Sequence, residues 1–208
     1  MGEFDSIIED KQRLGKLLEN SFVIITNTDK PYEIWKEKKQ LITKAINKDG
    51  NILDIGCANG FLLRSLIEWS KFKLTPYGID VEMNLIEDAK KLLPEYSKNF
   101  MTCSLRNLEN VCGKDLPKDF DFVYWNVWDN FTFENQADLD GLKKLFCVVK
   151  NGGRLILGFY DVDKNRRLDK INSIKKQGYE IKGKIDSRYT ETIVWIDKDS
   201  KSNNRSII

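Results

Sequence analysis

Short apolar runs alternate with longer amphipathic segments from residue 51 onward, and this alternation constrains the possible fold more than any other feature. The alternating apolar periods predict strands and helices in turn. Strands are expected at 51–56, 77–80, 100–104, 122–126 and 154–160, with helices between them at 61–70, 82–93 and 137–149. This order predicts an open, mostly parallel sheet with helices on both faces. Right-handed crossovers then bring the carboxyl ends of the strands to one edge, where ligands of such sheets bind.

The end of the chain departs from this alternation. A helix is expected at 164–177, and two strand-like stretches follow, YEIKGKIDS and ETIVWIDK, with only three residues between them. Two strands joined so closely are expected to pair as an antiparallel hairpin. The predicted fold is therefore α/β, with a mostly parallel sheet that ends in an antiparallel hairpin.

Composition narrows the classes of function. A chain of 208 residues with 41% hydrophobic residues is long enough for one substantial core, and a net charge of +2 gives no strong field for nucleic acid or anionic membranes. There is no histidine, and the four cysteines lack CxxC spacing, so no metal site is expected. No apolar run approaches the roughly 20 residues of a membrane span, and the acidic start MGEFDSIIED lacks the apolar stretch of a signal peptide. We therefore expect a cytoplasmic protein with reduced thiols.

The stretch NILDIGCANG places an acid, Asp54, at the end of a buried strand, with Gly56 and Gly60 just beyond it. Glycines at such a turn let a ligand lie against bare backbone, and exposed N–H groups at the helix start would favour an anionic group. The spacing D-x-G-x-A-x-G is not the dinucleotide pattern G-x-G-x-x-G. Asp80, at the end of the second strand, is well placed to accept hydrogen bonds from two ribose hydroxyls. The alternative is a strand-to-helix turn with no ligand.

These motifs resemble those of the class I S-adenosylmethionine-dependent methyltransferases. In that family the first motif is an acid followed by x-Gly-x-Gly/Ala-x-Gly, and an acid closing the second strand holds the ribose. FDFVYWNVWDNF resembles the fourth motif, whose strand end borders the reactive methyl group, and NGGRL resembles the turn into the fifth strand. The resemblance covers roughly residues 32 to 198 and implies a Rossmann-like sheet of seven strands.

The resemblance also implies the site. The residues expected to bind S-adenosyl-L-methionine are Asp54, Gly56, Cys57, Ala58, Gly60, Asp80, Val81, Ser104, Leu105 and Asn126. The residues expected to act in catalysis are Asn126 and Asp129. Where the family often has an acid for the adenine amino group, this chain has Ser104, whose uncharged oxygen predicts a weaker contact.

Without histidine, any general base must be Asp, Glu, Tyr or Lys. Asp129, Glu134 and Asp161 follow the fourth and fifth strands, so they are expected at the edge where the ligand binds. Of the aromatic residues around the fourth motif, Tyr124 and Trp128 are expected in the core and Trp125 in the pocket. Tyr32 or Trp35 could cover the cofactor, or belong to an ordinary amphipathic helix.

The expected organisation is an N-terminal helical cap over 1–48, a catalytic core over 49–198 and a flexible tail over 199–208. Within the cap we expect helices at 6–20 and 32–46, with a short strand or linker at 22–26. The expected function is methyl transfer to a small-molecule acceptor. Residues 164–208 hold twelve Lys or Arg against six Asp or Glu, which leaves RNA as the alternative acceptor. A catalytically idle relative that acts as a binding protein is the other alternative, and the oligomeric state is not predicted.

Overall fold

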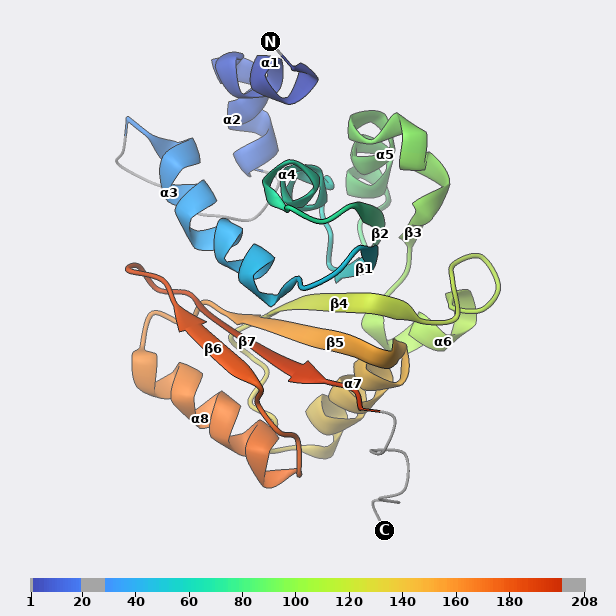
Figure 1. Ribbon diagram of the computed structural model, residues 1–208, viewed down its shortest axis with the longest axis vertical. Helices are drawn as coiled ribbons and strands as arrows, with labels where there is room; N and C mark the ends of the chain where they lie inside the picture. The colour runs from blue at the N-terminus through green and yellow to red at the C-terminus, as the bar shows by residue number, and fades with distance from the viewer. Residues whose placement is uncertain (1, 20–28, 200–208) are drawn as a thin grey trace.

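The computed structural model describes residues 2–19 and 29–199. Seven strands form one sheet in the order β3-β2-β1-β4-β5-β7-β6 (Figure 1). The strands are β1 (Gly50–Ile55), β2 (Leu74–Asp80), β3 (Phe100–Thr102), β4 (Phe120–Val127), β5 (Val149–Phe159), β6 (Gly183–Asp186) and β7 (Thr192–Asp197). Strands β1 to β5 run parallel to one another, whereas β7 runs antiparallel to both β5 and β6. The predicted α/β fold with its terminal hairpin is confirmed.

Helices cover both faces of the sheet (Figure 1). The N-terminal helices are α1 (Glu3–Glu9), α2 (Lys11–Glu19), α3 (Pro31–Lys39) and the 3-10 helix η1 (Gln40–Ala45). The helices between and after the strands are α4 (Phe61–Trp69), α5 (Met83–Leu92), η2 (Pro94–Asn99), η3 (Leu105–Asn107), α6 (Leu108–Val111), α7 (Gln136–Cys147) and α8 (Lys164–Lys176). Helices η1, α4 and α5 pack on one face, and α6, α7 and α8 on the other. Their apolar stripes bury both faces of the central strands, which are accordingly apolar throughout.

The N-terminal segment differs from its sequence prediction. One helix over 6–20 is wrong, because Asp10 adopts an extended conformation and ends α1. Its carboxylate then accepts hydrogen bonds from the N–H groups of Gln12 and Arg13 and so begins α2. The expected helix at 32–46 becomes α3 followed by the tighter η1, and β3 ends two residues early. The proposed strand or linker at 22–26 lies outside the described residues.

None of the helices in these two described ranges combines the length and the apolar character that crossing a bilayer requires.

Candidate functional site

A cavity of about 640 Å³ opens at the carboxyl edge of the sheet, beside α7. The strand ends supply Gly56 after β1, Asp80 at the end of β2 with Val81 after it, and Ser104 and Leu105 after β3. These five residues come from three separate crossovers, and the parallel order of the strands brings them together. Most of the surface around them is apolar, with Trp125 and Phe131 forming the side next to β4.

Asp80 organises the edge of this cavity. One oxygen of its carboxylate accepts the Ala58 N–H over 2.9 Å, and the other accepts the Glu82 N–H over 3.0 Å. The first bond holds Ala58 in the left-handed conformation, at a φ of 48°, which is uncommon for a residue with a side chain. A carboxylate offers about four acceptor positions, so two remain for hydroxyl groups of a ligand. Asp80 therefore shapes the loop as well as facing the cavity.

The two glycines of the loop have different reasons to be glycine. Both have a positive φ, 76° at Gly56 and 74° at Gly60. A Cβ at Gly56 would meet no atom within 4 Å, so its bare backbone faces open space at the cavity. A Cβ at Gly60 would lie 3.0 Å from the Cβ of Ala89. Gly56 thus suits a ligand, whereas Gly60 lets α4 pack closely against α5.

Several backbone N–H groups of the loop are already engaged within the protein and so are not free for an anion. Gly56 and Cys57 both donate to the Ile79 carbonyl, at 2.8 and 3.0 Å. The Ala58 N–H is held by Asp80, and the Phe61 N–H by the Asn59 side chain at 3.1 Å. Cys57, Ala58 and Asn59 are themselves buried. The turn therefore gives these N–H groups hydrogen-bond partners within the protein, because a buried backbone donor without a partner is costly.

A buried cluster of charges lies behind the loop. Lys39, at the end of α3, donates to Glu191 over 2.6 Å, and both side chains are buried. Glu191 precedes β7, and because β7 is antiparallel its start lies at the same edge as the ends of β1 and β4. The second carboxylate oxygen of Glu191 has no hydrogen-bond partner among the described residues. No local sequence pattern indicates this pair, because its members lie 152 residues apart.

Asp54 lies near this cluster and is only 2% exposed. Burial raises the pKa of Asp54 to about 7, with a further upward contribution from the charge of Asp80 and an opposing one from Lys39. An acid with so high a pKa is partly protonated near neutral pH. Asp54 does not line the cavity, so in this structure it is a buried acid behind the loop.

The raised pKa makes stability depend on pH. Unfolding restores the ordinary pKa of Asp54, so between about pH 4 and pH 7 the folded state binds more protons, and its stability falls as the pH rises. Asp54→Asn removes this dependence. We expect the free energy of unfolding of the wild type, relative to the variant, to fall by about 3 kcal/mol from pH 5 to pH 8. Urea denaturation at the two pH values measures it, and parallel changes in both proteins would contradict the assignment.

A family model described as a methyltransferase domain matches residues 46–200, about three quarters of the chain. The chain belongs to the class I S-adenosylmethionine-dependent methyltransferase family. No curated protein matches it.

Solved structures share the fold of this methyltransferase. A TehB-like S-adenosylmethionine-dependent methyltransferase from Corynebacterium glutamicum is 17% identical, with a TM-score of 0.57 over 94% of this chain and 100% of that one. The N-methyltransferase NodS from Bradyrhizobium japonicum is 16% identical, with a TM-score of 0.57 over 82% and 98%. Fibrillarin from Aeropyrum pernix, solved with natively bound S-adenosyl-L-methionine, is 15% identical, with a TM-score of 0.55 over 77% and 76%. At these identities the likeness establishes the fold alone.

The predicted site residues of the methyltransferase divide into two groups. Those that line the cavity are Gly56, Asp80, Val81, Ser104 and Leu105. Those outside its lining are Asp54, Cys57, Ala58, Gly60, Asn126 and Asp129. Asn126 is the next-to-last residue of β4 and is half-buried, and its side-chain oxygen accepts a hydrogen bond from the Tyr124 hydroxyl at 3.2 Å. Asp129 is exposed on the loop after β4. The structure thus gathers the residues expected to hold adenosine, and leaves the two expected catalytic residues beside the cavity.

The aromatic residues of the fourth motif are only partly as predicted. Tyr124 is fully buried, as expected, and Trp125 is buried but lines the cavity. The expectation that Trp128 lies in the core is wrong, because it is 53% exposed at the cavity. Trp35 stacks on Phe61 at 4.7 Å between ring centroids, within a buried cluster of the N-terminal helices. Its interpretation as a cover for the cofactor is therefore wrong, and Tyr32 does not line the cavity either.

Proposed function

We propose that this protein transfers a methyl group from S-adenosyl-L-methionine to a small-molecule acceptor. The observation that carries the proposal is the cavity at the strand edge, where Asp80 has spare acceptor positions next to the bare backbone of Gly56. A carboxylate beside open backbone suits a ribose diol, and the cavity volume lies within the usual range for small-molecule sites. The bound cofactor of fibrillarin, a protein of the same fold, is consistent with this assignment.

The lining residues fit the parts of such a cofactor. Asp80 would accept hydrogen bonds from both ribose hydroxyls, since each of its oxygens has a free position. Val81 and Leu105 are apolar residues that would lie against the adenine faces, and the Ser104 hydroxyl is available to the adenine amino group. When bound, S-adenosyl-L-methionine supplies a methyl group activated by the positive charge on sulfur.

The protein itself would contribute to catalysis by positioning the acceptor and by excluding water from the cavity. The rings of Trp125 and Phe131 contact each other edge to face, with their centroids 4.7 Å apart. Together they close the β4 side of the cavity with apolar surface. Holding the acceptor in line with the methyl group can lower the barrier by several kcal/mol without a covalent intermediate. Asn126 and Asp129 remain the proposed catalytic residues, with Asp129 as the general base where the acceptor carries a proton.

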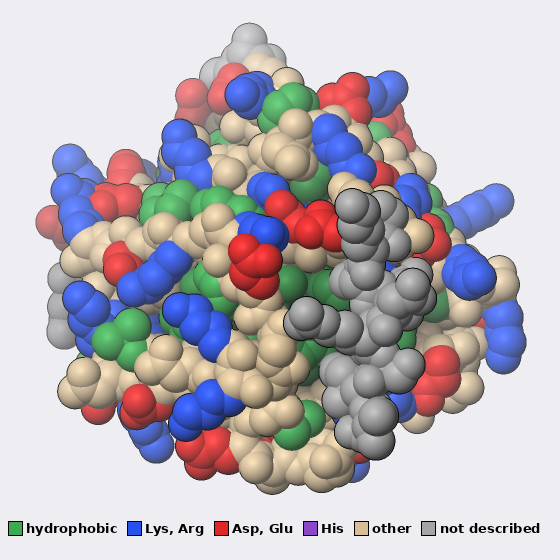
Figure 2. All heavy atoms as spheres, turned by 60° about the horizontal axis from the view of Figure 1, so that its bottom comes forward, with side chains coloured by type: hydrophobic (Ala, Val, Ile, Leu, Met, Phe, Trp, Pro, Cys, Tyr) green, Lys and Arg blue, Asp and Glu red, His purple; other side chains and the backbone are tan. Residues whose placement is uncertain are grey.

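Charge pairing on the C-terminal hairpin favours a small molecule over RNA. Its basic residues have acidic partners, in the pairs Lys182–Glu180, Lys184–Asp186 and Arg188–Glu37. Figure 2 shows Lys and Arg side chains interspersed with Asp and Glu on the face that lies at the bottom of Figure 1. RNA binding relies on basic groups left free for phosphates. These three pairs are typical of a solvated edge of the sheet.

Isothermal titration with S-adenosylhomocysteine tests the proposal. We expect saturable 1:1 binding, and competition by adenosine but much weaker competition by 2′,3′-dideoxyadenosine, which lacks the diol that Asp80 would hold. Absence of binding by the folded protein would contradict the proposal and favour a catalytically idle relative. A salt-sensitive shift of labelled RNA would instead move the acceptor class to RNA.

A further inference from the structure

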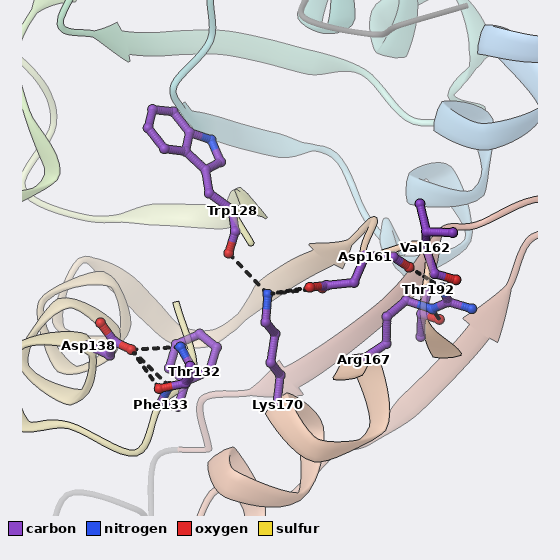
Figure 3. A network of polar contacts seen from close by, with 9 residues as sticks. All are labelled: Trp128, Thr132, Phe133, Asp138, Asp161, Val162, Arg167, Lys170 and Thr192. Carbon is purple, nitrogen blue, oxygen red and sulfur yellow. Dashed lines mark hydrogen bonds and ion pairs between the residues drawn. The ribbon is translucent and has the colours of Figure 1, made fainter. Parts of the chain in front are cut away.

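Trp128 stands out because a large aromatic side chain is exposed at the cavity. Its side chain lines the cavity and is 53% exposed, whereas Trp125, three residues earlier, is 4% exposed. Figure 3 shows the indole ring pointing away from Lys170, on the opposite side of the Trp128 backbone from its carbonyl group. An exposed indole leaves a large apolar area in water, which costs free energy unless a ligand covers it.

The backbone of Trp128 is anchored by a buried charge. Lys170, on α8, donates to the Trp128 carbonyl over 3.1 Å. Its ammonium also contacts both oxygens of Asp161 at 2.9 Å, and the two side chains are 5% and 2% exposed. On the same helix, Arg167 donates to the Asp161 carbonyl and to the Thr192 hydroxyl (Figure 3). The loops after β4 and β5 are therefore joined to one helix.

The other end of the Trp128 loop is fixed as well. Asp138, at the start of α7, accepts the N–H groups of Thr132 and Phe133 at 2.7 and 3.0 Å. Phe133 has a φ of 60°, an uncommon conformation that this carboxylate holds in place (Figure 3). Burying a Lys–Asp pair costs desolvation and adds little net stability. The Lys170–Asp161 pair is therefore better explained by a role in fixing the loop that carries the exposed Trp128 ring.

The strand order separates Trp128 from the adenine side. Val81 and Leu105 follow β2 and β3, on one side of β1, whereas Trp128 follows β4 on the other. A nucleoside held by Asp80 would occupy the first side. We infer that Trp128 is the wall of an acceptor subsite for a planar aromatic group, and that Lys170 is the residue that positions it. This inference rests on the proposed function and names the acceptor class of that site.

The test uses two neutral probes, 2-naphthol and its saturated counterpart decahydro-2-naphthol, titrated by NMR into protein saturated with S-adenosylhomocysteine. We expect the planar probe to bind about fivefold more tightly, because stacking adds to the area buried. Trp128→Ala should abolish this preference and Trp128→Phe should keep most of it, with the affinity for S-adenosylhomocysteine unchanged. Equal binding of the two probes to the wild type would overturn the inference, as would a parallel loss of S-adenosylhomocysteine affinity in Trp128→Ala.

The positioning role has its own variants. Lys170→Met combined with Asp161→Asn removes both charges, so that neither is left buried and unpaired. We expect this double variant to fold, to bind S-adenosylhomocysteine normally and to lose most of the preference for 2-naphthol. Lys170→Arg, which keeps a cation for Asp161, should retain more of it. An unchanged preference in the double variant would overturn the role of Lys170. If the wild type failed to bind S-adenosylhomocysteine, the proposed function would fall with the inference, whereas normal binding and equal probe affinities would overturn the inference alone.

Discussion

Asp80→Asn is expected to weaken binding of S-adenosylhomocysteine by about 10- to 100-fold, because hydrogen bonds to a charged acceptor contribute about 1.5–3 kcal/mol each. The amide keeps the size of the side chain but offers one acceptor oxygen in place of two. That oxygen cannot serve the Ala58 N–H, the Glu82 N–H and a ribose hydroxyl together. Isothermal titration measures the affinity, and thermal unfolding shows whether the variant is folded.

A matched control lies on the helix that follows Asp80. Asp88→Asn, on α5, changes a carboxylate whose partner is Lys91 in a surface ion pair. It is expected to leave the affinity unchanged, since exposed pairs contribute about 0–1 kcal/mol even to stability. A folded Asp80→Asn variant with wild-type affinity would show that this carboxylate serves the loop and not the ligand.

Lys39→Met is expected to lower the free energy of unfolding by about 3–5 kcal/mol, because it leaves the Glu191 carboxylate buried without its cation. The pair joins α3 to the start of β7, so its loss should also loosen the N-terminal helices from the sheet. Urea denaturation measures the change in stability.

The matching double variant separates the cost of an unpaired charge from a loss of packing. Lys39→Met with Glu191→Gln removes both charges and should recover most of the lost stability. Lys91→Met, in the surface pair with Asp88, provides the exposed comparison and is expected to cost about 0–1 kcal/mol. A loss in Lys39→Met no larger than that of Lys91→Met would contradict the buried role of this pair.

Much of the fold could be predicted because its signals are local. The periods of apolar residues indicated the parallel strands and the helices between them, and the short link of three residues indicated the hairpin. The prediction of a single helix over 6–20 was wrong, because Asp can either continue a helix or cap the start of the next one. Here the Asp10 carboxylate accepts the N–H groups of Gln12 and Arg13 and so caps the second helix.

The site could be predicted in part, and for the same reason. Gly56 and Asp80 each close a strand, so the parallel order alone brings them to one edge. Asn126 and Asp129 also follow a strand, but whether such side chains enter a cavity depends on the loop after it. Here that loop is set by Asp138 and Lys170, from two different helices.

The sequence by itself determined the alternation of strands and helices, the antiparallel end of the sheet, and the positions of an acid and a glycine at the edge where ligands bind. Only the tertiary structure decided that Gly60 serves helix packing, that Trp128 is exposed while Trp125 is buried, and that Lys39 pairs with Glu191. The physical reason is the distance along the chain over which each interaction acts. Backbone preference and apolar period act between near neighbours, whereas burial and charge pairing depend on how distant segments pack.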